Sequence, residues 1–262
     1  MATYSLKEIA SSFEQKRNWE RQFPVNYYIV RPLSFLITYF AIRLTNSPSR
    51  IAWIGFVIGL AGCFSFLGIN LWSAWPCVTL LFTFSLLDAV DGNIARTTGN
   101  VTYYGKFLDG LLGETIEASY CFFIGLGLAR GLAIFSNCED DITTQGLVQV
   151  IPLICGTVIM SGRLLSSFVD LKYEYHAFEK ERDKNIGRKN IYDEIQSSTF
   201  RNKWYYIVFI NINLLNNQII ILVLCLGFGK ITFFLYLLAP YYVVRAIVYF
   251  LFFLSRAKQR LS

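Results

Sequence analysis

Long apolar segments constrain the fold of this chain more than any other feature. Six of them could each cross roughly 30 Å of hydrocarbon as a helix, and they run over residues 51–69, 73–93, 106–129, 147–170, 204–228 and 231–254. Backbone groups must be paired in lipid, and no segment alternates as a barrel strand would. With 54% hydrophobic residues and a mean hydropathy of +0.43, an ordinary soluble domain is excluded. The sequence predicts an all-α integral membrane protein with six transmembrane helices.

A further apolar stretch, residues 25–44, is interrupted by two arginines and a proline. We expect it to lie in the membrane interface as an amphipathic helix instead of spanning the bilayer. The chain then divides into a cytoplasmic N-terminus with an interfacial helix, residues 1–48, and a six-helix transmembrane domain, residues 49–262. The N-terminal residues are polar and lack the apolar core of a cleaved signal peptide.

Lysine and arginine residues gather on one side of this topology. They are frequent before the first segment, in the connections between the second and third and between the fourth and fifth segments, and in the tail. The opposite connections contain only Arg130 and Lys230. Because cationic loops stay in the cytoplasm, both termini are predicted to be cytoplasmic. A seventh span would place the N-terminal cations on the outer side of the membrane. We attribute the net charge of +6 to orientation and lipid headgroups, not to a nucleic-acid partner.

Three aspartates lie where the second and third segments approach the cytoplasmic face. Asp88 and Asp91 are three residues apart and share a helix face, and Asp109 lies at the start of the next helix. A connection rich in Gly, Thr and Asn can fold one helix back on the other. The three side chains either are helix-end charges in the headgroup zone or converge as hard oxygen donors for a divalent cation, Mg²⁺ or Mn²⁺. Their spacing favours the metal site.

The same stretch has the residue types that a phosphate ligand requires. Gly92 and Gly105 lack side chains, so a bulky ligand can approach the backbone there. Arg96 lies nearby and can pair with a phosphate oxygen.

Residues 88–109 follow the pattern D-x2-D-G-x2-A-R-x8-G-x3-D. This pattern resembles the signature of the CDP-alcohol phosphotransferases, also called CDP-alcohol phosphatidyltransferases. The resemblance extends over the chain, since that family also has an interfacial N-terminal helix and six spans, with the motif joining the second and third. The stretch LTNSPSRIAWIGF, residues 44–56, loosely resembles the family's entry to the first span.

The resemblance implies metal-dependent transfer of a phosphoryl-alcohol group, for example phosphatidyl, from a CDP-alcohol to an acceptor alcohol, with release of CMP. It implies a role in phospholipid synthesis and a homodimer. By matching position, the residues implied as Mg²⁺ or Mn²⁺ ligands are Asp88, Asp91 and Asp109. The small residues implied to lie beside the cytidine and phosphates are Gly92, Ala95 and Gly105.

The family pattern ends with a further aspartate, which is thought to deprotonate the acceptor hydroxyl and to lie beside the metal. This chain has Gly113 at that position, and glycine cannot take a proton. Glu117 lies one turn further on nearly the same stripe, and helical side chains lean toward the N-terminus. We therefore expect Glu117, or as a second choice Glu114, to replace the missing base or metal ligand. The alternatives are that both glutamates only face an aqueous cavity, or that the chain has lost activity.

Two arginines within the later spans are further candidates. Arg163 is expected to bind a phosphate of the donor or acceptor, whereas Arg245 either does the same or extends to the headgroups. The asparagine-rich stretch at residues 211–218 either bonds between helices or lines a polar pocket. Two rival functions remain: the same chemistry with a non-lipid product such as an inositol-phosphate compound, and a cation-binding transporter or scaffold. Against a transporter, no internal repeat is present.

Overall fold

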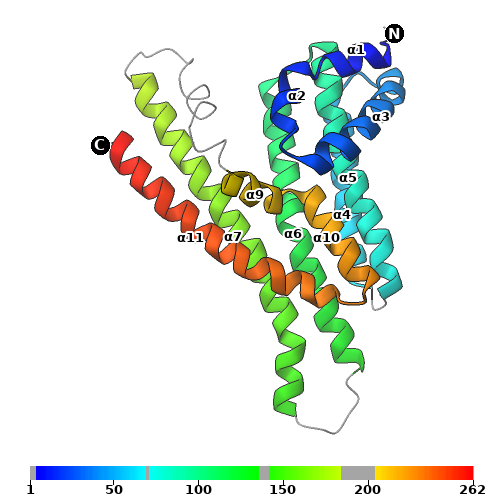
Figure 1. Ribbon diagram of the computed structural model, residues 1–262, viewed down its shortest axis with the longest axis vertical. Helices are drawn as coiled ribbons and strands as arrows, with labels where there is room; N and C mark the ends of the chain where they lie inside the picture. Colours follow the sequence, from blue (N-terminus) through cyan, green and yellow to red (C-terminus); the bar gives the residue numbers. More distant parts are fainter. Residues whose placement is uncertain (1–3, 69–70, 136–141, 184–203, 262) are drawn as a thin grey trace.

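The computed structural model describes residues 4–68, 71–135, 142–183 and 204–261. Every element in these ranges is a helix, which confirms the predicted all-α class (Figure 1). In chain order the elements are α1 (Leu6–Ser11), α2 (Glu14–Glu20), the π-helix η1 (Asn26–Val30), α3 (Arg31–Leu44), α4 (Pro48–Ser65), α5 (Leu71–Thr98), α6 (Tyr103–Phe135), α7 (Ile142–Asp183), α9 (Trp204–Asn213), α10 (Leu215–Gly227) and α11 (Ile231–Leu261).

Within the described ranges, five helices are long and apolar enough to cross a membrane. They are α4, α5, α6, α7 and α11, with candidate spans Pro48–Ser65, Ala74–Thr98, Tyr103–Gly131, Val150–His176 and Ile231–Lys258. A multi-pass membrane protein is thereby confirmed, but a count of six spans is not. The remaining predicted segment consists of two helices, α9 and α10. The 13 residues of α10 rise about 20 Å, which is short of the hydrocarbon thickness.

The break between α9 and α10 falls in the asparagine-rich stretch, at Leu214. Helix carbonyls freed by such a break must find other donors inside a membrane protein. The side-chain amide of Gln218 donates to the carbonyl of Ile212 at 2.7 Å, and that of Asn217 donates to the carbonyl of Asn211 at 2.7 Å. The side chains of Gln218 and Asn217 therefore supply donors to two carbonyls where the chain turns.

The same stretch also links α10 to other elements. The hydroxyl of Ser85 on α5 donates to the Asn216 side-chain oxygen at 2.5 Å, and the Asn216 amide donates to Asn26 at 2.7 Å. Of the two interpretations that the sequence allowed, bonding between helices is therefore the one that these contacts support.

The segment expected at the interface forms η1 and the 14-residue helix α3. The outer face of α3 carries exposed apolar side chains, namely Leu33, Leu36, Phe40 and Leu44. Its inner face packs on α5 and holds two small polar residues, Ser34 and Thr38, that are fully buried. The helix is thus amphipathic in an unusual sense, because its small polar residues face the protein.

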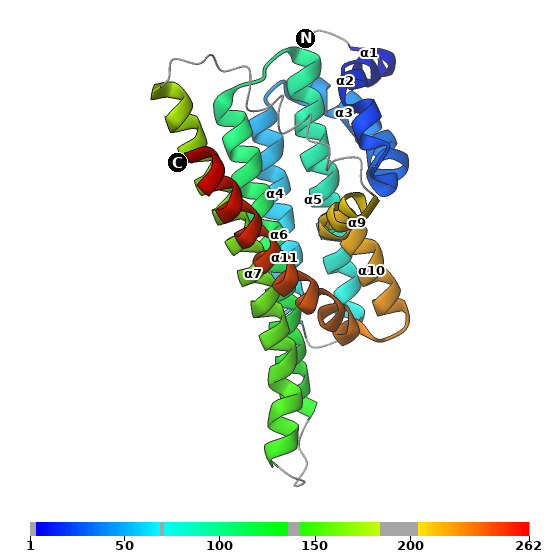
Figure 2. The same ribbon diagram turned by 60° about the vertical axis from the view of Figure 1, so that its left-hand side comes forward.

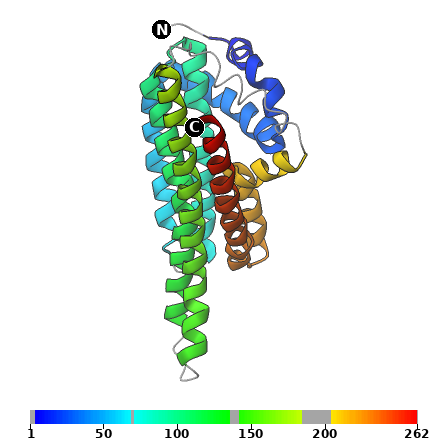
Figure 3. The ribbon, with the colours of Figure 1, turned by 90° about the vertical axis from the view of Figure 1, so that its left-hand side faces the viewer.

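The long helices pack closely around one core. Helix α4 packs against α5 and α6, and α7 packs against α6 and α11; α6 and α7 lie side by side in both further views (Figures 2 and 3). A Cβ placed on Gly156 of α7 would lie only 2.6 Å from the carbonyl oxygen of Cys121, so glycine permits this close approach. The α5–α6 connection lies at the same end of the bundle as the N-terminus (Figure 2).

Candidate active site

A cavity of about 750 Å³ opens where α4 begins, α5 ends and α6 begins. The residues of the aspartate motif that line it are Asp91, Gly92, Ala95, Arg96, Gly105 and Asp109. The fold therefore brings residues of the motif from the end of α5 and from the start of α6 to one space.

Local backbone features shape this space. Helix α5 ends before Gly99, whose φ of 69° lies in the left-handed region that glycine adopts without strain. The hydroxyl oxygen of Thr102 accepts a hydrogen bond from the backbone N–H of Gly105 at 2.9 Å and caps the start of α6. Because N–H groups in the first helical turn lack intrahelical partners, this wall carries partial positive charge. The cavity wall therefore suits an anionic ligand.

The three aspartates lie around one inner space. Asp88, Asp91 and Asp109 all line a small hollow of about 10 Å³ beneath the main cavity, together with Gly113. Asp91 and Asp109 also line the main cavity. Asp91 is 6% exposed, whereas Asp88 and Asp109 retain exposed surface. The three aspartates therefore border one space.

The donor chemistry of this group fits a hard divalent cation. The three residues offer carboxylate oxygens, and none of them is in an ion pair with a described lysine or arginine. Nevertheless, no three Asp, Glu, His or Cys side chains among the described residues are already arranged as a ligand set. The side chains would have to rotate toward a bound cation, and the small inner hollow beside Gly113 gives them some room.

Arg96 lies over the glycine that the sequence suggested as room for a ligand. Its guanidinium Nη2 donates to the Asn93 side-chain oxygen at 2.8 Å. A Cβ placed on Gly92 would lie 3.2 Å from Arg96 Nη1. The Arg96 guanidinium therefore occupies the space beside Gly92 on the same helix. Both residues still line the cavity.

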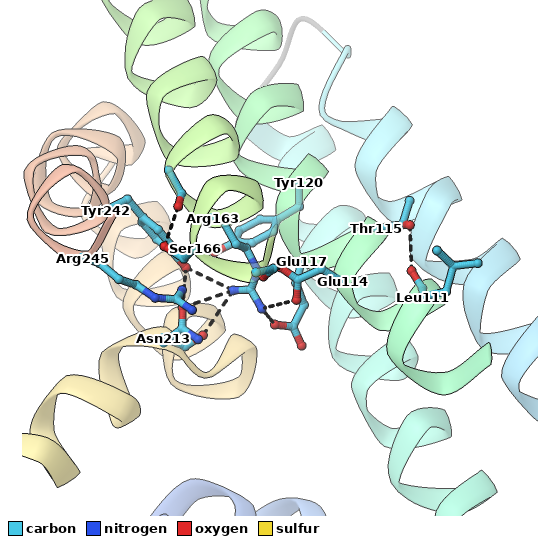
Figure 4. Close-up of polar contacts among 12 residues, drawn as sticks. Leu111, Glu114, Thr115, Glu117, Tyr120, Arg163, Ser166, Asn213, Tyr242 and Arg245 are labelled. Carbon is cyan, nitrogen blue, oxygen red and sulfur yellow. Dashed lines mark hydrogen bonds and ion pairs between the residues drawn. The ribbon is translucent and has the colours of Figure 1, made fainter. Parts of the chain in front are cut away.

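The glutamates of α6 form a group with the buried Arg163 of α7 (Figure 4). Arg163 is 4% exposed. Its Nε lies 3.1 Å from Glu114 Oε1, and its Nη2 forms an ion pair with Glu117. The Ser167 hydroxyl also donates to Glu114 at 2.7 Å. One carboxylate oxygen of Glu117 is thus directed at Arg163.

Asparagine and tyrosine side chains complete this group. Arg163 donates to the Tyr242 hydroxyl at 3.1 Å, and the Gln218 amide donates to the same hydroxyl at 2.9 Å. Arg245 donates to the side-chain oxygen of Asn213. Neither Arg163 nor Arg245 lines the 750 Å³ cavity, so a phosphate in that cavity would meet other cations first.

Sequence reasoning missed several polar residues that line the cavity. Lys106 supplies a second cation beside Arg96, and Asn100 and Thr102 come from the connection. Ser47 and Ser49 come from the start of α4. The signal available for the last two was the stretch LTNSPSR, which preceded the first span but was not assigned a binding role.

Comparison with known proteins places these residues in a family context. The model of the family described as CDP-alcohol phosphatidyltransferase matches residues 35–168, about half of the chain. The archaetidylinositol phosphate synthase of Pyrococcus horikoshii is 37% identical over 116 residues. That alignment covers 40% of this chain and 60% of the relative, so the similarity spans less than two thirds of the relative's length.

Proposed function

The chain belongs to the CDP-alcohol phosphatidyltransferase family, and we propose that it transfers a phosphoryl-alcohol group from a CDP-alcohol to an acceptor alcohol. The acceptor oxygen would form a bond to the phosphorus that carries the donor alcohol. The bond between that phosphorus and the CMP oxygen would break, and CMP would leave. The acceptor hydroxyl would lose its proton in the same reaction.

The observation that carries the proposal is the coincidence of the motif with the cavity. The motif residues line a cavity with two cationic side chains, Arg96 and Lys106, and with the first turn of α6. Such a wall would bind the pyrophosphate of the donor. Asp91 and Asp109 border the same cavity from its inner side, where the reacting phosphorus would lie.

Mg²⁺ or Mn²⁺ is the proposed cofactor, held by Asp88, Asp91 and Asp109. When bound, the cation would neutralise charge on the phosphoryl oxygens in the transition state. The carboxylates would hold the cation beside the donor, and Arg96 would orient a phosphate of the donor pyrophosphate. These roles are assigned by the chemistry of the side chains and by their position at the cavity.

For the acceptor proton, we propose Glu117 as the base, with Glu114 as the second candidate. Both carboxylates are held by Arg163, and their side chains are 27% and 33% exposed. Transfer of the proton to Glu117 would require this carboxylate to turn from Arg163 toward the acceptor. The ion pair between Arg163 and Glu117 would then break for the proton transfer and form again afterwards. Arg163 would have this role in addition to any contact with an acceptor phosphate.

The relative named an archaetidylinositol phosphate synthase suggests an inositol-phosphate acceptor and a lipid donor. A product of that kind would place this chain in phospholipid synthesis. We further propose a homodimer with both termini and the cavity on the cytoplasmic side. A non-lipid product and a cation transporter are the alternatives that the assay must separate.

The test is CMP release by the purified full chain, with lipid and non-lipid CDP-alcohols as donors and a panel of alcohols as acceptors. Activity should require Mg²⁺ or Mn²⁺ and disappear with a chelator. Asp91→Asn should lower turnover by roughly 100-fold or more, because a group that stabilises transition-state charge is lost. Asp170→Asn is the matched control, since Asp170 lies on α7 outside the cavity.

Two outcomes would contradict this proposal. If no donor releases CMP while the protein in liposomes carries a cation flux, a transporter is the better interpretation. If Asp91→Asn and Asp170→Asn have equal activity, the cavity described here is not where the reaction occurs.

A further inference from the structure

A buried asparagine connects α3 to the arginine of the cavity. Asn93 lies between the motif residues Gly92 and Ala95, at a position that the family pattern leaves free, and its side chain is fully buried. Its amide nitrogen lies 3.1 Å from the Ser34 hydroxyl and 3.3 Å from the Thr38 hydroxyl. Its oxygen accepts the hydrogen bond from Arg96. The amide nitrogen of Asn93 therefore faces α3, and its amide oxygen faces Arg96.

The hydroxyl groups on α3 determine which end of the amide points where. Ser34 donates its hydroxyl hydrogen to the carbonyl of Arg31 at 2.9 Å, and Thr38 donates to the carbonyl of Ser34 at 2.6 Å. With their hydrogens used, both hydroxyls can only accept. They must face the nitrogen of Asn93, which leaves the Asn93 oxygen directed at Arg96. The helix α3 thus fixes an acceptor for the guanidinium.

Arg96 has few other polar contacts that would hold its direction. Its Nε is buried and has no hydrogen-bond partner among the described residues. The guanidinium carbon lies 5.8 Å from the ring centroid of Phe13. Such a cation–π contact does little to fix the orientation of the guanidinium. Glu20, Asp91 and Asp109 attract Arg96 at longer range, and the bond to Asn93 is the side-chain hydrogen bond that directs its guanidinium in the described structure.

We propose that Asn93 is a positioning residue, through which α3 orients Arg96 toward the phosphates of a nucleotide in the cavity. This inference rests on the proposed function, because it assumes that the cavity binds a cytidine nucleotide. Asn93 itself touches no ligand in this proposal. Its loss should weaken nucleotide binding and raise the KM for the donor, while kcat at saturating donor changes less.

The test is a double-mutant cycle between Asn93 and Arg96, read by calorimetric binding of CMP with Mg²⁺ to the full chain in detergent. Asn93→Ala should weaken CMP binding by about tenfold, the size expected for a hydrogen bond to a charged group. In the Arg96→Ala background the same substitution should change binding less than twofold, because its effect passes through Arg96. Thr38→Val should weaken binding in the same direction.

Ser85→Ala supplies the matched control. It also removes a buried hydrogen bond from α5, the 2.5 Å contact with Asn216, but it does not touch Arg96. Its CMP affinity should equal that of the wild type. Thermal denaturation of each variant separates weaker binding from loss of folding, and if Asn93→Ala does not fold, Thr38→Val carries the cycle.

Each remaining result has a definite meaning. Wild-type protein that binds no CMP would overturn the proposed function and this inference with it. Wild-type binding together with unchanged affinity in Asn93→Ala would overturn the inference alone. The inference would also be overturned if Asn93→Ala lowered CMP affinity equally in the wild type and in the Arg96→Ala background. Asn93 would then act through the general structure of α5.

Discussion

At the scale of single residues, Gly113 stands where the signature that this chain resembles has a further aspartate. A Cβ placed there would lie 3.9 Å from a carboxylate oxygen of Asp88. An aspartate at this position would therefore join the three carboxylates around the inner hollow. Instead, Glu114 and Glu117 lie further along α6 and are both paired with Arg163. The chain thus has a glycine beside the three aspartates and a glutamate–arginine group further along the same helix.

The first prediction concerns the base. Glu117→Gln should lower kcat by about 100-fold or more, the usual contribution of a general base, with little change in the KM for the CDP-alcohol. Glu114→Gln should have a smaller effect, and steady-state CMP release measures both. Full activity in Glu117→Gln would show that Glu117 is not the base.

A compensating substitution sharpens this prediction. Gly113→Asp in the Glu117→Gln background should restore part of the lost turnover, because the new carboxylate would face Asp88. Failure of this double variant to recover, with normal thermal stability, would indicate that position 113 cannot serve as the base in this chain.

At the scale of secondary-structure elements, the division of residues 204–228 into α9 and α10 is the main departure from the predicted topology. Figure 3 shows α9 and α10 at an angle to each other instead of forming one rod. Gln218 is central to this turn, since it is fully buried and contacts Ile212, Tyr242 and Tyr120. One side chain therefore caps the broken helix and joins it to α6 and α11.

The second prediction follows from these contacts. Gln218→Leu should leave the Ile212 carbonyl and the Tyr120 hydroxyl buried without their partner. Each unsatisfied group costs about 1–3 kcal/mol, so thermal denaturation in detergent should show a large fall in stability. Thr157→Val is the control, because the exposed Thr157 hydroxyl donates to the carbonyl one turn earlier on its own helix, at 2.8 Å. Equal stability of the two variants would contradict the proposed role of Gln218.

At the scale of the whole molecule, the helices form a bundle whose cavity opens near one end. The α5–α6 connection, α1 and the N-terminus lie toward this end (Figures 1 and 2). Part of the predicted cationic connection, residues 184–203, lies outside the described residues. Lys106 and Arg96 nevertheless place positive charge at the cavity itself.

The third prediction concerns orientation. A membrane-impermeant maleimide added to intact cells should label Lys230→Cys, in the exposed turn between α10 and α11, and should not label Arg21→Cys. The physical reason is the retention of cationic segments in the cytoplasm. Wild-type cells give the background from the native cysteines. Labelling of Arg21→Cys alone would indicate the opposite orientation and contradict the proposal.

Much of the fold could be predicted because its causes are local in the sequence. The five long helices begin and end within a few residues of the predicted segments, apart from extensions such as that of α7 beyond residue 170. The carboxylates at 88, 91 and 109 could be grouped because helical spacing and a short connection bring them together. By contrast, the partner of Glu117 lies 46 residues away on another helix, and no local pattern identifies it.

The sequence by itself determined the class of this protein, the position of its membrane helices and the motif that assigns its family. These properties depend on apolar length, on helical periodicity and on residue types at fixed spacing, which are all present in one linear stretch. Only the tertiary structure decided that Arg163 pairs with the glutamates, that the fifth segment turns at Leu214, and that α3 reaches Arg96 through Asn93. A buried polar group takes whichever partner packing brings within hydrogen-bonding distance, and that choice is made in three dimensions.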